Sequence, residues 1–174
     1  MIYQIEGIGK MFFFRCLIFI IYSTGLLSNL FSGTINESGK LHIATCQFPV
    51  SSDISANANW IQQQMQESKQ QGADIVHFPE CALSGYAGVD YQSFDNFDWI
   101  ELREQTKAIV SLADELDLWV ILGSTHRLSE GNKPHNSLYI INSEGQIIDR
   151  YDKRFCTKMI WNIIHRGIIL LYLR

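Results

Sequence analysis

A short apolar run that ends on a single acidic residue does most to constrain how this chain can fold. Residues 73–78 are largely apolar and partly β-branched, with Gly72 before them and Pro79 after them. A run of this length between a glycine and a proline is typical of a buried strand in an α/β sheet. Glu80 follows directly. Because ligands bind beyond the carboxyl ends of strands in such sheets, Glu80 is predicted to lie where chemistry can take place.

Around this run the chain alternates between strand and helix patterns. Residues 41–48 have the pattern of a strand, and the helix predicted after it ends at Gly72. Its apolar stripe consists of Ile54, Ala58, Ile61 and Met65. A second helix over residues 99–116 and a buried strand over residues 118–124 follow. The stripe of the second helix consists of Leu102, Ile109, Leu112 and Leu116.

The next segment has the pattern of a β-hairpin. Residues 136–142 and 146–151 alternate or run apolar on either side of a Ser-Glu-Gly turn. Lys153 stands at the end of this predicted hairpin. The complete order is therefore strand, helix, strand, helix, strand and hairpin, which indicates an α/β fold.

The stretch over residues 72–86, GADIVHFPECALSGY, resembles the glutamate signature of the nitrilase superfamily of carbon–nitrogen hydrolases. Many such signatures continue with proline, and Ala87 stands there instead, which alters loop stiffness rather than reactivity. Tyr151-Asp152-Lys153 resembles the lysine motif of the same superfamily, as the Asn136-Ser137 pair resembles its upstream strand. The resemblance covers residues 41–157.

This resemblance implies an incomplete α-β-β-α sandwich of the carbon–nitrogen hydrolase type, of which the chain holds the first half. It also implies an amidase or nitrilase mechanism with a Glu, a Lys and a Cys. Glu80 would be the general base and Lys153 would stabilise the tetrahedral species, while a Cys thiolate attacks the amide or nitrile carbon. Without the resemblance, Glu80 and Lys153 read as solvated charges in a loop and at a hairpin end.

The side chains near Glu80 suggest how its surroundings are built. We expect an apolar pocket of Phe78, Leu83 and Tyr86 around its carboxylate. The loop between Tyr86 and Trp99 is rich in aromatic residues. These aromatic side chains either wall a substrate pocket or pack locally, and the sequence leaves both open.

The sequence has no counterpart of the strand that carries the nucleophilic cysteine in the superfamily. The superfamily pattern continues beyond the lysine to a strand with Cys-x-Asp and then Arg-Phe-Pro-Glu, whereas residues 159–174 contain no Cys, Asp or Glu. Cys46 reads as a core residue, Cys81 is expected to face away from Glu80, and Cys16 belongs to the leader. Cys156 is the one surrogate that merits a test.

Composition limits the remaining functions. With 174 residues, 47% hydrophobic and 18% charged, the chain suits one soluble domain, and a net charge of −4 without a Lys/Arg cluster argues against nucleic acid as a partner. The spacing of the cysteines supports neither zinc nor a disulfide framework. The separations of His77, His126 and His135 fit no metal motif, so we predict neither metal nor cofactor. A small amide or nitrile is the expected substrate, and a completed domain is expected to form the homo-oligomers of the superfamily.

The two ends differ from the middle of the chain. We interpret residues 1–40 as a leader, residues 41–157 as the partial hydrolase domain and residues 158–174 as a divergent apolar tail, where the reading frame departs near Lys158. Residues 11–31 resemble a signal peptide or short anchor. The alternative is that residues 1–40 are an upstream extension without a structural role. We expect a cytoplasmic protein, with export or membrane anchoring through residues 11–31 as the alternative.

Two function classes follow. The first is a carbon–nitrogen hydrolase of the amidase or nitrilase type that is inactive as the chain stands, because its Cys nucleophile is missing. The second is a non-catalytic half-domain that binds a partner with the complementary strands or has no function.

Overall fold

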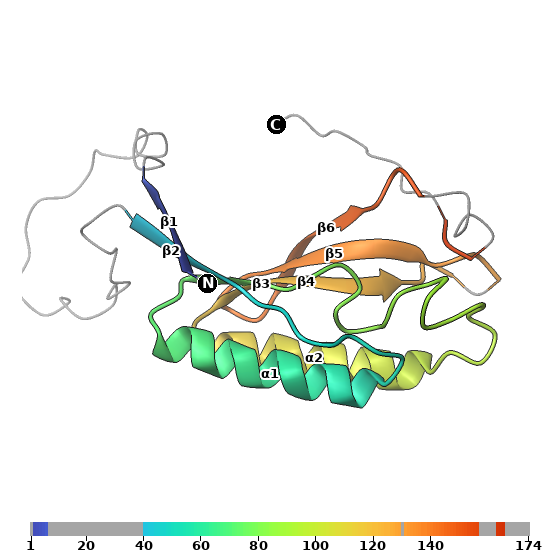
Figure 1. Cartoon of the computed structure of the whole chain (residues 1–174), viewed down its shortest axis with the longest axis horizontal. Coiled ribbons are helices and arrows are strands. Elements are labelled where there is room, and N and C mark those ends of the chain that lie inside the picture. Colours follow the sequence, from blue (N-terminus) through green and yellow to red (C-terminus); the bar gives the residue numbers. More distant parts are fainter. Residues whose placement is uncertain (1, 7–39, 130, 157–162, 166–174) are drawn as a thin grey trace, which may run out of the picture.

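A mixed sheet of six strands, covered by two helices on one face, forms the described part of the chain (Figure 1). The structure is a computed structural model that describes residues 2–6, 40–129, 131–156 and 163–165. The strands are β1 (Ile2–Glu6), β2 (Lys40–Thr45), β3 (Ile75–His77), β4 (Trp119–His126), β5 (His135–Ile141) and β6 (Ile147–Asp152), and the helices are α1 (Ile54–Gln70) and α2 (Trp99–Glu115). Strands β2, β3 and β4 pair in parallel, and the other neighbours pair antiparallel. The predicted α/β fold is therefore confirmed.

Each helix begins at an aspartate that caps it. The Asp53 carboxylate accepts a hydrogen bond from the backbone N–H of Ala56 at 2.9 Å, and Asp98 caps α2 in the same way. Such caps satisfy backbone donors that have no partner inside the helix. Helix α1 ends at Gln70, two residues before the predicted end, and the chain turns through Gly72 at φ +81°. The left-handed backbone that favours glycine therefore explains this boundary.

The core lies between the two helices and the sheet. All members of the predicted α1 stripe are buried. In α2, Leu102 and Ile109 are buried, whereas Leu112 and Leu116 pack against the core while partly exposed. Residues such as Leu122 on β4 meet the helices from the sheet and are fully buried. Both predicted stripes are thus the faces that the helices turn toward the sheet.

Strand β3 is shorter than predicted, although the backbone of Asp74 before it still bonds to His42 and to Trp119. The strand covers three residues, and Asp74 before it accepts a hydrogen bond from the backbone N–H of His42 at 2.8 Å. That carboxylate joins the start of β3 to β2. Strand β2 ends at Thr45 rather than at residue 48, and strands β4, β5 and β6 differ from the predicted ones by one or two residues at their ends.

One strand lies in a region where the sequence predicted no element. Strand β1 falls within the predicted leader, and its backbone pairs antiparallel with β2, so that Glu6 lies opposite Lys40. The edge of β2 thereby gains a hydrogen-bonding neighbour. Residues 11–31 and most of the predicted tail lie outside the described residues. Within the described ranges, neither helix is long and apolar enough to cross a membrane.

Candidate active site

Glu80 lies in a turn that leaves the end of β3 and rests on β4. The backbone N–H of Phe78 donates to the carbonyl of Ile121 on β4 at 2.9 Å, and that of Leu83 donates to Gly123 at 3.0 Å. Between these anchors Cys81 has φ 55°, a left-handed conformation that is uncommon for a residue with a side chain. The turn is therefore fixed on both sides of Glu80.

Gly123 makes this close approach possible. A Cβ atom at Gly123 would lie 2.1 Å from the carbonyl oxygen of Pro79 and 2.7 Å from the backbone nitrogen of Cys81. Both are backbone atoms, so the turn would have to move to make room. The absence of a side chain on this residue of β4 thus determines where Glu80 is held. The sequence analysis missed Gly123, although a glycine inside a strand often marks a close approach of another backbone.

Lys153 reaches the same place from the end of β6. Its Nζ lies 2.6 Å from Oε1 of Glu80, across a sequence separation of 73 residues. The Lys153 side chain is 31% exposed and that of Glu80 is 42% exposed, so the pair lies at the surface and a small molecule can reach it. The structure thus brings the two predicted site residues together.

Two further side chains complete the surroundings of the Glu80 carboxylate. The Nδ2 group of Asn136 donates to Oε1 of Glu80 at 2.6 Å, and the hydroxyl of Tyr86 donates to the same oxygen at 3.4 Å. Asn136 lies on β5 and is buried. Sequence reasoning noted Asn136 only as part of a strand motif. A polar amide in a strand with an apolar pattern was the signal that could have marked it.

The expected apolar pocket around Glu80 is wrong. Phe78 and Leu83 are fully buried in the core, and only Tyr86 of the three predicted neighbours contacts the carboxylate. The physical reason is that the side chains on either side of Glu80 turn inward while Glu80 faces solvent and polar donors. The contacts that the structure shows at the Glu80 carboxylate are hydrogen bonds from polar groups.

The surroundings of Glu80 raise the pKa of both Lys153 and Tyr86. The hydrogen bond to Glu80 raises the pKa of Lys153 above its usual value, although partial burial acts in the opposite direction. Burial, followed by the charge of Glu80, raises the pKa of the Tyr86 phenol. Lys153 is therefore a cation and Tyr86 a neutral donor at neutral pH. This gives the site a fixed positive charge beside a carboxylate.

The described cysteines are not arranged as an obvious nucleophile. Cys46, Cys81 and Cys156 are not in disulfides. Burial, followed by the charge of Glu80, raises the pKa of Cys81 to about 12, so its thiol stays protonated at neutral pH. Cys81 is 2% exposed, and its left-handed backbone departs from the strand geometry on which the prediction about its side chain rested. Cys156 is buried in a small cluster with Ala87 and Ile164.

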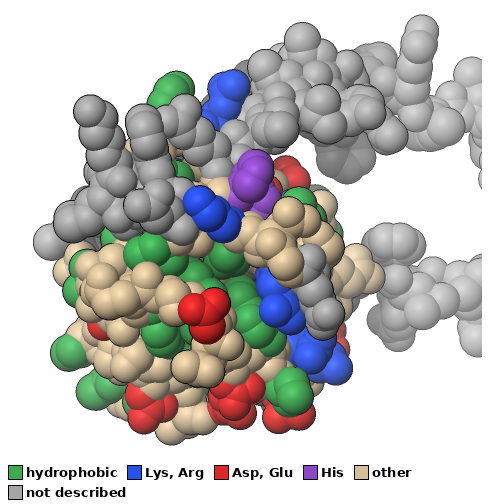
Figure 2. Space-filling view, turned by 90° about the vertical axis from the view of Figure 1, so that its right-hand side faces the viewer, with side chains coloured by type: hydrophobic (Ala, Val, Ile, Leu, Met, Phe, Trp, Pro, Cys, Tyr) green, Lys and Arg blue, Asp and Glu red, His purple; other side chains and the backbone are tan. Residues whose placement is uncertain are grey.

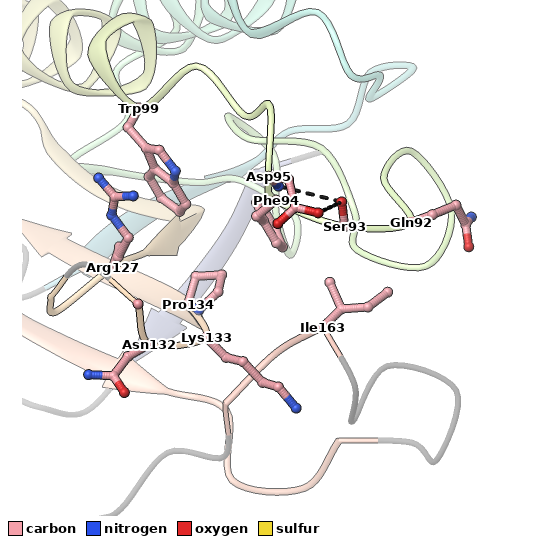
Figure 3. A pocket seen from close by; sticks show the side chains of 11 residues that line it. Gln92, Ser93, Phe94, Asp95, Trp99, Arg127, Asn132, Lys133, Pro134 and Ile163 are labelled. Carbon is pink, nitrogen blue, oxygen red and sulfur yellow. Dashed lines mark hydrogen bonds between the residues drawn. The ribbon is translucent and has the colours of Figure 1, made fainter.

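A cavity of about 380 Å³ lies beside the aromatic loop, and neither Glu80 nor Lys153 lines it (Figure 3). Two residues that line this cavity are in contact, since the Arg127 guanidinium lies over the Trp99 ring, 4.4 Å from its centre. Within the loop, the Phe94 and Phe97 rings are 5.0 Å apart, and Phe97 is buried in the core. The aromatic residues therefore pack locally, and Phe94 also walls this cavity.

The surface at this end of the molecule is mixed. Figure 2 shows apolar side chains at its centre with basic and acidic side chains around them.

Among the described residues, no group of three or more His, Cys, Asp or Glu side chains is placed to hold a metal ion. Burial lowers the pKa of both His126 and His135, so both imidazoles are neutral at neutral pH.

Comparison with known proteins identifies the family of this chain. The family model of carbon-nitrogen hydrolases matches residues 42–162. A glutamine-dependent NAD(+) synthetase of Acinetobacter baylyi is 30% identical over 112 residues, which is 64% of this chain and 20% of that protein. The chain belongs to the carbon–nitrogen hydrolase family.

Solved structures share the fold. The glutamine-dependent NAD+ synthetase from Acinetobacter baumannii has a TM-score of 0.58 at 22% identity, covering 73% of this chain and 24% of that one. A glutamate-to-glutamine mutant of the amidase from Nesterenkonia sp. AN1, with the product of Michael addition of acrylamide at its active-site cysteine, has a TM-score of 0.66 at 14% identity. That match covers 74% of this chain and 50% of the amidase. The chain thus spans about half the length of this amidase and about a fifth of the curated relative.

Proposed function

We propose that this chain supplies the glutamate and the lysine of a carbon–nitrogen hydrolase site that acts on a small amide or nitrile. The observation that carries the proposal is the 2.6 Å contact between Lys153 Nζ and Glu80 Oε1 at an accessible end of the sheet. A carboxylate and an ammonium group in contact can move a proton and stabilise an oxyanion within one site. The nucleophile of this site is proposed to be a cysteine that lies outside this chain.

The first chemical step forms an acyl-enzyme. Glu80 accepts the proton of the cysteine thiol, and the sulfur attacks the carbonyl carbon of the amide. The electron pair of the C=O bond moves to oxygen, and the resulting oxyanion is stabilised by the Lys153 ammonium group. When the C–N bond breaks, Glu80 returns its proton to the leaving nitrogen. Ammonia or an amine departs, and a thioester remains.

The second step releases the acid. Glu80 accepts a proton from water, and the hydroxide formed attacks the thioester carbon. Lys153 stabilises the second oxyanion as it did the first. The C–S bond then breaks and the sulfur takes back the proton, so that the carboxylic acid leaves and the site is restored. No step requires a metal or a cofactor.

The state of the cysteines supports a nucleophile from elsewhere. The raised pKa of Cys81 makes its thiol a poor nucleophile at neutral pH, and the pKa of Cys46 is also raised by burial. Cys156 is buried beside Ala87 and Ile164. We therefore propose that the chain alone does not hydrolyse amides at an appreciable rate.

A second candidate function is that of a non-catalytic half-domain that binds a partner. Its support is the face of the sheet opposite the helices. By register, Ile121 on β4 lies opposite Ile140 on β5, and neither belongs to the buried core between helices and sheet. At the edge, Ile148 and Tyr151 of β6 are 51% and 47% exposed. Exposed apolar groups on a strand of this kind are typical of a surface that another polypeptide covers.

Release of ammonia from butyramide and from glutamine separates these functions. The full chain is assayed alone and after co-expression with the part of the Acinetobacter baylyi relative that follows its matched region. We expect background release from the chain alone and clear release from the pair. The Glu80→Gln change should reduce the paired activity by about 10²–10⁴-fold, the usual contribution of a general base.

The variants decide the outcome. Release by the chain alone that is lost in both Glu80→Gln and Cys156→Ala would make Cys156 a surrogate nucleophile and would contradict the external cysteine. Release by the pair that persists in Glu80→Gln and in Lys153→Met would refute the proposed catalytic roles. A stable pair without activity would favour the partner-binding half-domain.

A further inference from the structure

We infer that Asn136 is a positioning residue of this site, which holds one oxygen of Glu80 so that the other stays available for proton transfer. The inference rests on the proposed function of Glu80 and adds a role for a residue outside the glutamate and lysine pair. Two observations support it. One is which oxygen of Glu80 accepts the hydrogen bonds, and the other is the set of contacts that Asn136 makes.

The hydrogen bonds to Glu80 all converge on one atom. Lys153 Nζ and Asn136 Nδ2 each lie 2.6 Å from Oε1, and the Tyr86 hydroxyl lies 3.4 Å from it. Within the described part of the chain, none of the hydrogen bonds to Glu80 ends on Oε2. The oxygen Oε1 is thus occupied by donors, and Oε2 is the oxygen with free capacity to accept a proton.

A carboxylate needs such donors to keep its orientation. The terminal torsion of a glutamate side chain is broad and roughly two-fold, so packing alone leaves its two oxygens free to exchange. Glu80 is 42% exposed, and solvent offers no fixed geometry. Lys153 is a flexible point charge with rotatable donors, which restrains the distance more than the plane of the carboxylate. The short contact from the Asn136 amide supplies the second fixed direction.

Asn136 is well suited to this role because the fold restrains it. Asn136 is 5% exposed and lies within β5, which pairs with β4 on one side and β6 on the other. Its backbone carbonyl accepts a hydrogen bond from the backbone N–H of Lys153 at 2.8 Å. One residue thereby contacts both members of the ion pair, Glu80 through its side chain and Lys153 through its backbone.

The neighbouring residue provides a matched control. The Ser137 hydroxyl donates to Oδ1 of Asp152 at 2.6 Å, and Ser137 is 1% exposed. Ser137 and Asn136 are therefore both buried polar residues at the same end of β5, and each bonds to a carboxylate from another segment. Of these two residues, only Asn136 bonds to Glu80. If these substitutions acted only by destabilising the strand, Asn136→Ala and Ser137→Ala would have the same effect.

The test is the pKa of Lys153, measured in the full chain by NMR of lysines labelled at the carbon next to Nζ. Lys153→Arg assigns the signal, and Glu80→Gln gives the pKa without the partner carboxylate. Since the hydrogen bond to Glu80 raises the pKa of Lys153, loss of a fixed Glu80 should lower it. We expect Asn136→Ala to lower this pKa most of the way to the Glu80→Gln value, and Ser137→Ala to leave it at the wild-type value.

Each outcome separates the inference from the proposed function. If Glu80→Gln lowers the pKa of Lys153 and Asn136→Ala does not, the positioning role is refuted while the ion pair stands. Equal shifts in Asn136→Ala and Ser137→Ala would also refute it, because they indicate a structural effect. If Glu80→Gln itself has no effect, the pair and with it the proposed function fail. Asn136→Leu, which removes the donor with little change in volume, replaces Asn136→Ala if the latter does not fold.

Discussion

The helix-covered face of the sheet and the end of the sheet beyond β3 are built in opposite ways. Under the helices, Ile61 and Leu122 are fully buried among other apolar side chains. Beyond β3, Glu80 and Lys153 are partly exposed and are held by polar contacts. The first region owes its stability to excluded water, and the second owes its geometry to a few directed contacts. Stability and the proposed chemistry are therefore expected to respond to different substitutions.

The largest effect on stability should come from the helix-covered face. We expect Leu122→Ala to lower the free energy of unfolding by about 2–5 kcal/mol, because it leaves a cavity in a packed core. Urea denaturation measures the change. Leu128→Ala is the control, since Leu128 is 63% exposed and should alter stability by no more than about 0.5 kcal/mol. Equal effects of the two substitutions would mean that this face is not the core.

Gly123 links the two regions, and its substitution should affect both. The Cβ of Gly123→Ala would meet backbone atoms of the Glu80 turn, so we expect a loss of about 1–3 kcal/mol together with a lower pKa of Lys153. Urea denaturation and the NMR titration measure these two effects. Ser124→Ala is the matched control on the same strand, because the buried Ser124 hydroxyl has no partner among the described residues and its removal should be nearly neutral. A Gly123→Ala protein that matches the wild type in both measurements would refute the close approach of the turn.

Asp152, the last residue of β6, accepts hydrogen bonds next to the site. Its contribution to the free energy of unfolding should depend on pH. Burial acts to raise the pKa of Asp152, but hydrogen bonds from Ser137 and Arg150 outweigh it and lower the pKa below its usual value. A carboxyl whose pKa falls on folding stabilises the protein above its unfolded pKa of about 3.9, and this stabilisation is lost as the pH falls through the folded pKa.

We therefore expect Asp152→Asn to cost about 1.5–3 kcal/mol near neutral pH, as for hydrogen bonds to a charged group. The difference between wild type and variant should shrink below about pH 4. Urea denaturation at a series of pH values measures it. A difference that stays constant between neutral pH and the acid range would show that the charge of Asp152 does not contribute.

The smallest effect on stability should come from the pair itself. An exposed ion pair contributes about 0–1 kcal/mol, so Glu80→Gln should leave the unfolding midpoint in urea almost unchanged. The same substitution is expected to reduce the proposed activity by about 10²–10⁴-fold. A loss of stability as large as that of Leu122→Ala would indicate that Glu80 serves the fold rather than a reaction.

Local patterns predicted the elements well and the polar contacts poorly. The stripes on α1 and α2 follow from a helical period that one segment carries by itself, and both were confirmed. The pairing of Glu80 with Lys153 came from a family resemblance, since nothing local relates residues 73 positions apart. The role of Gly123 and the contact of Asn136 depend on how the turn lies over β4 and β5, and a single strand pattern does not contain that information. The apolar pocket around Glu80 failed for the same reason.

The most direct test of the account is whether Glu80 and Lys153 are in contact in solution. A carbodiimide joins a carboxylate to an amine only where the two meet, with loss of water, and mass spectrometry of the digested protein locates the new amide. The account predicts a link between Glu80 and Lys153 that disappears in Glu80→Gln. The exposed pair of Lys69 and Asp117, 3.9 Å apart, is the internal reference. A link at the reference pair with none between Glu80 and Lys153 would contradict the site.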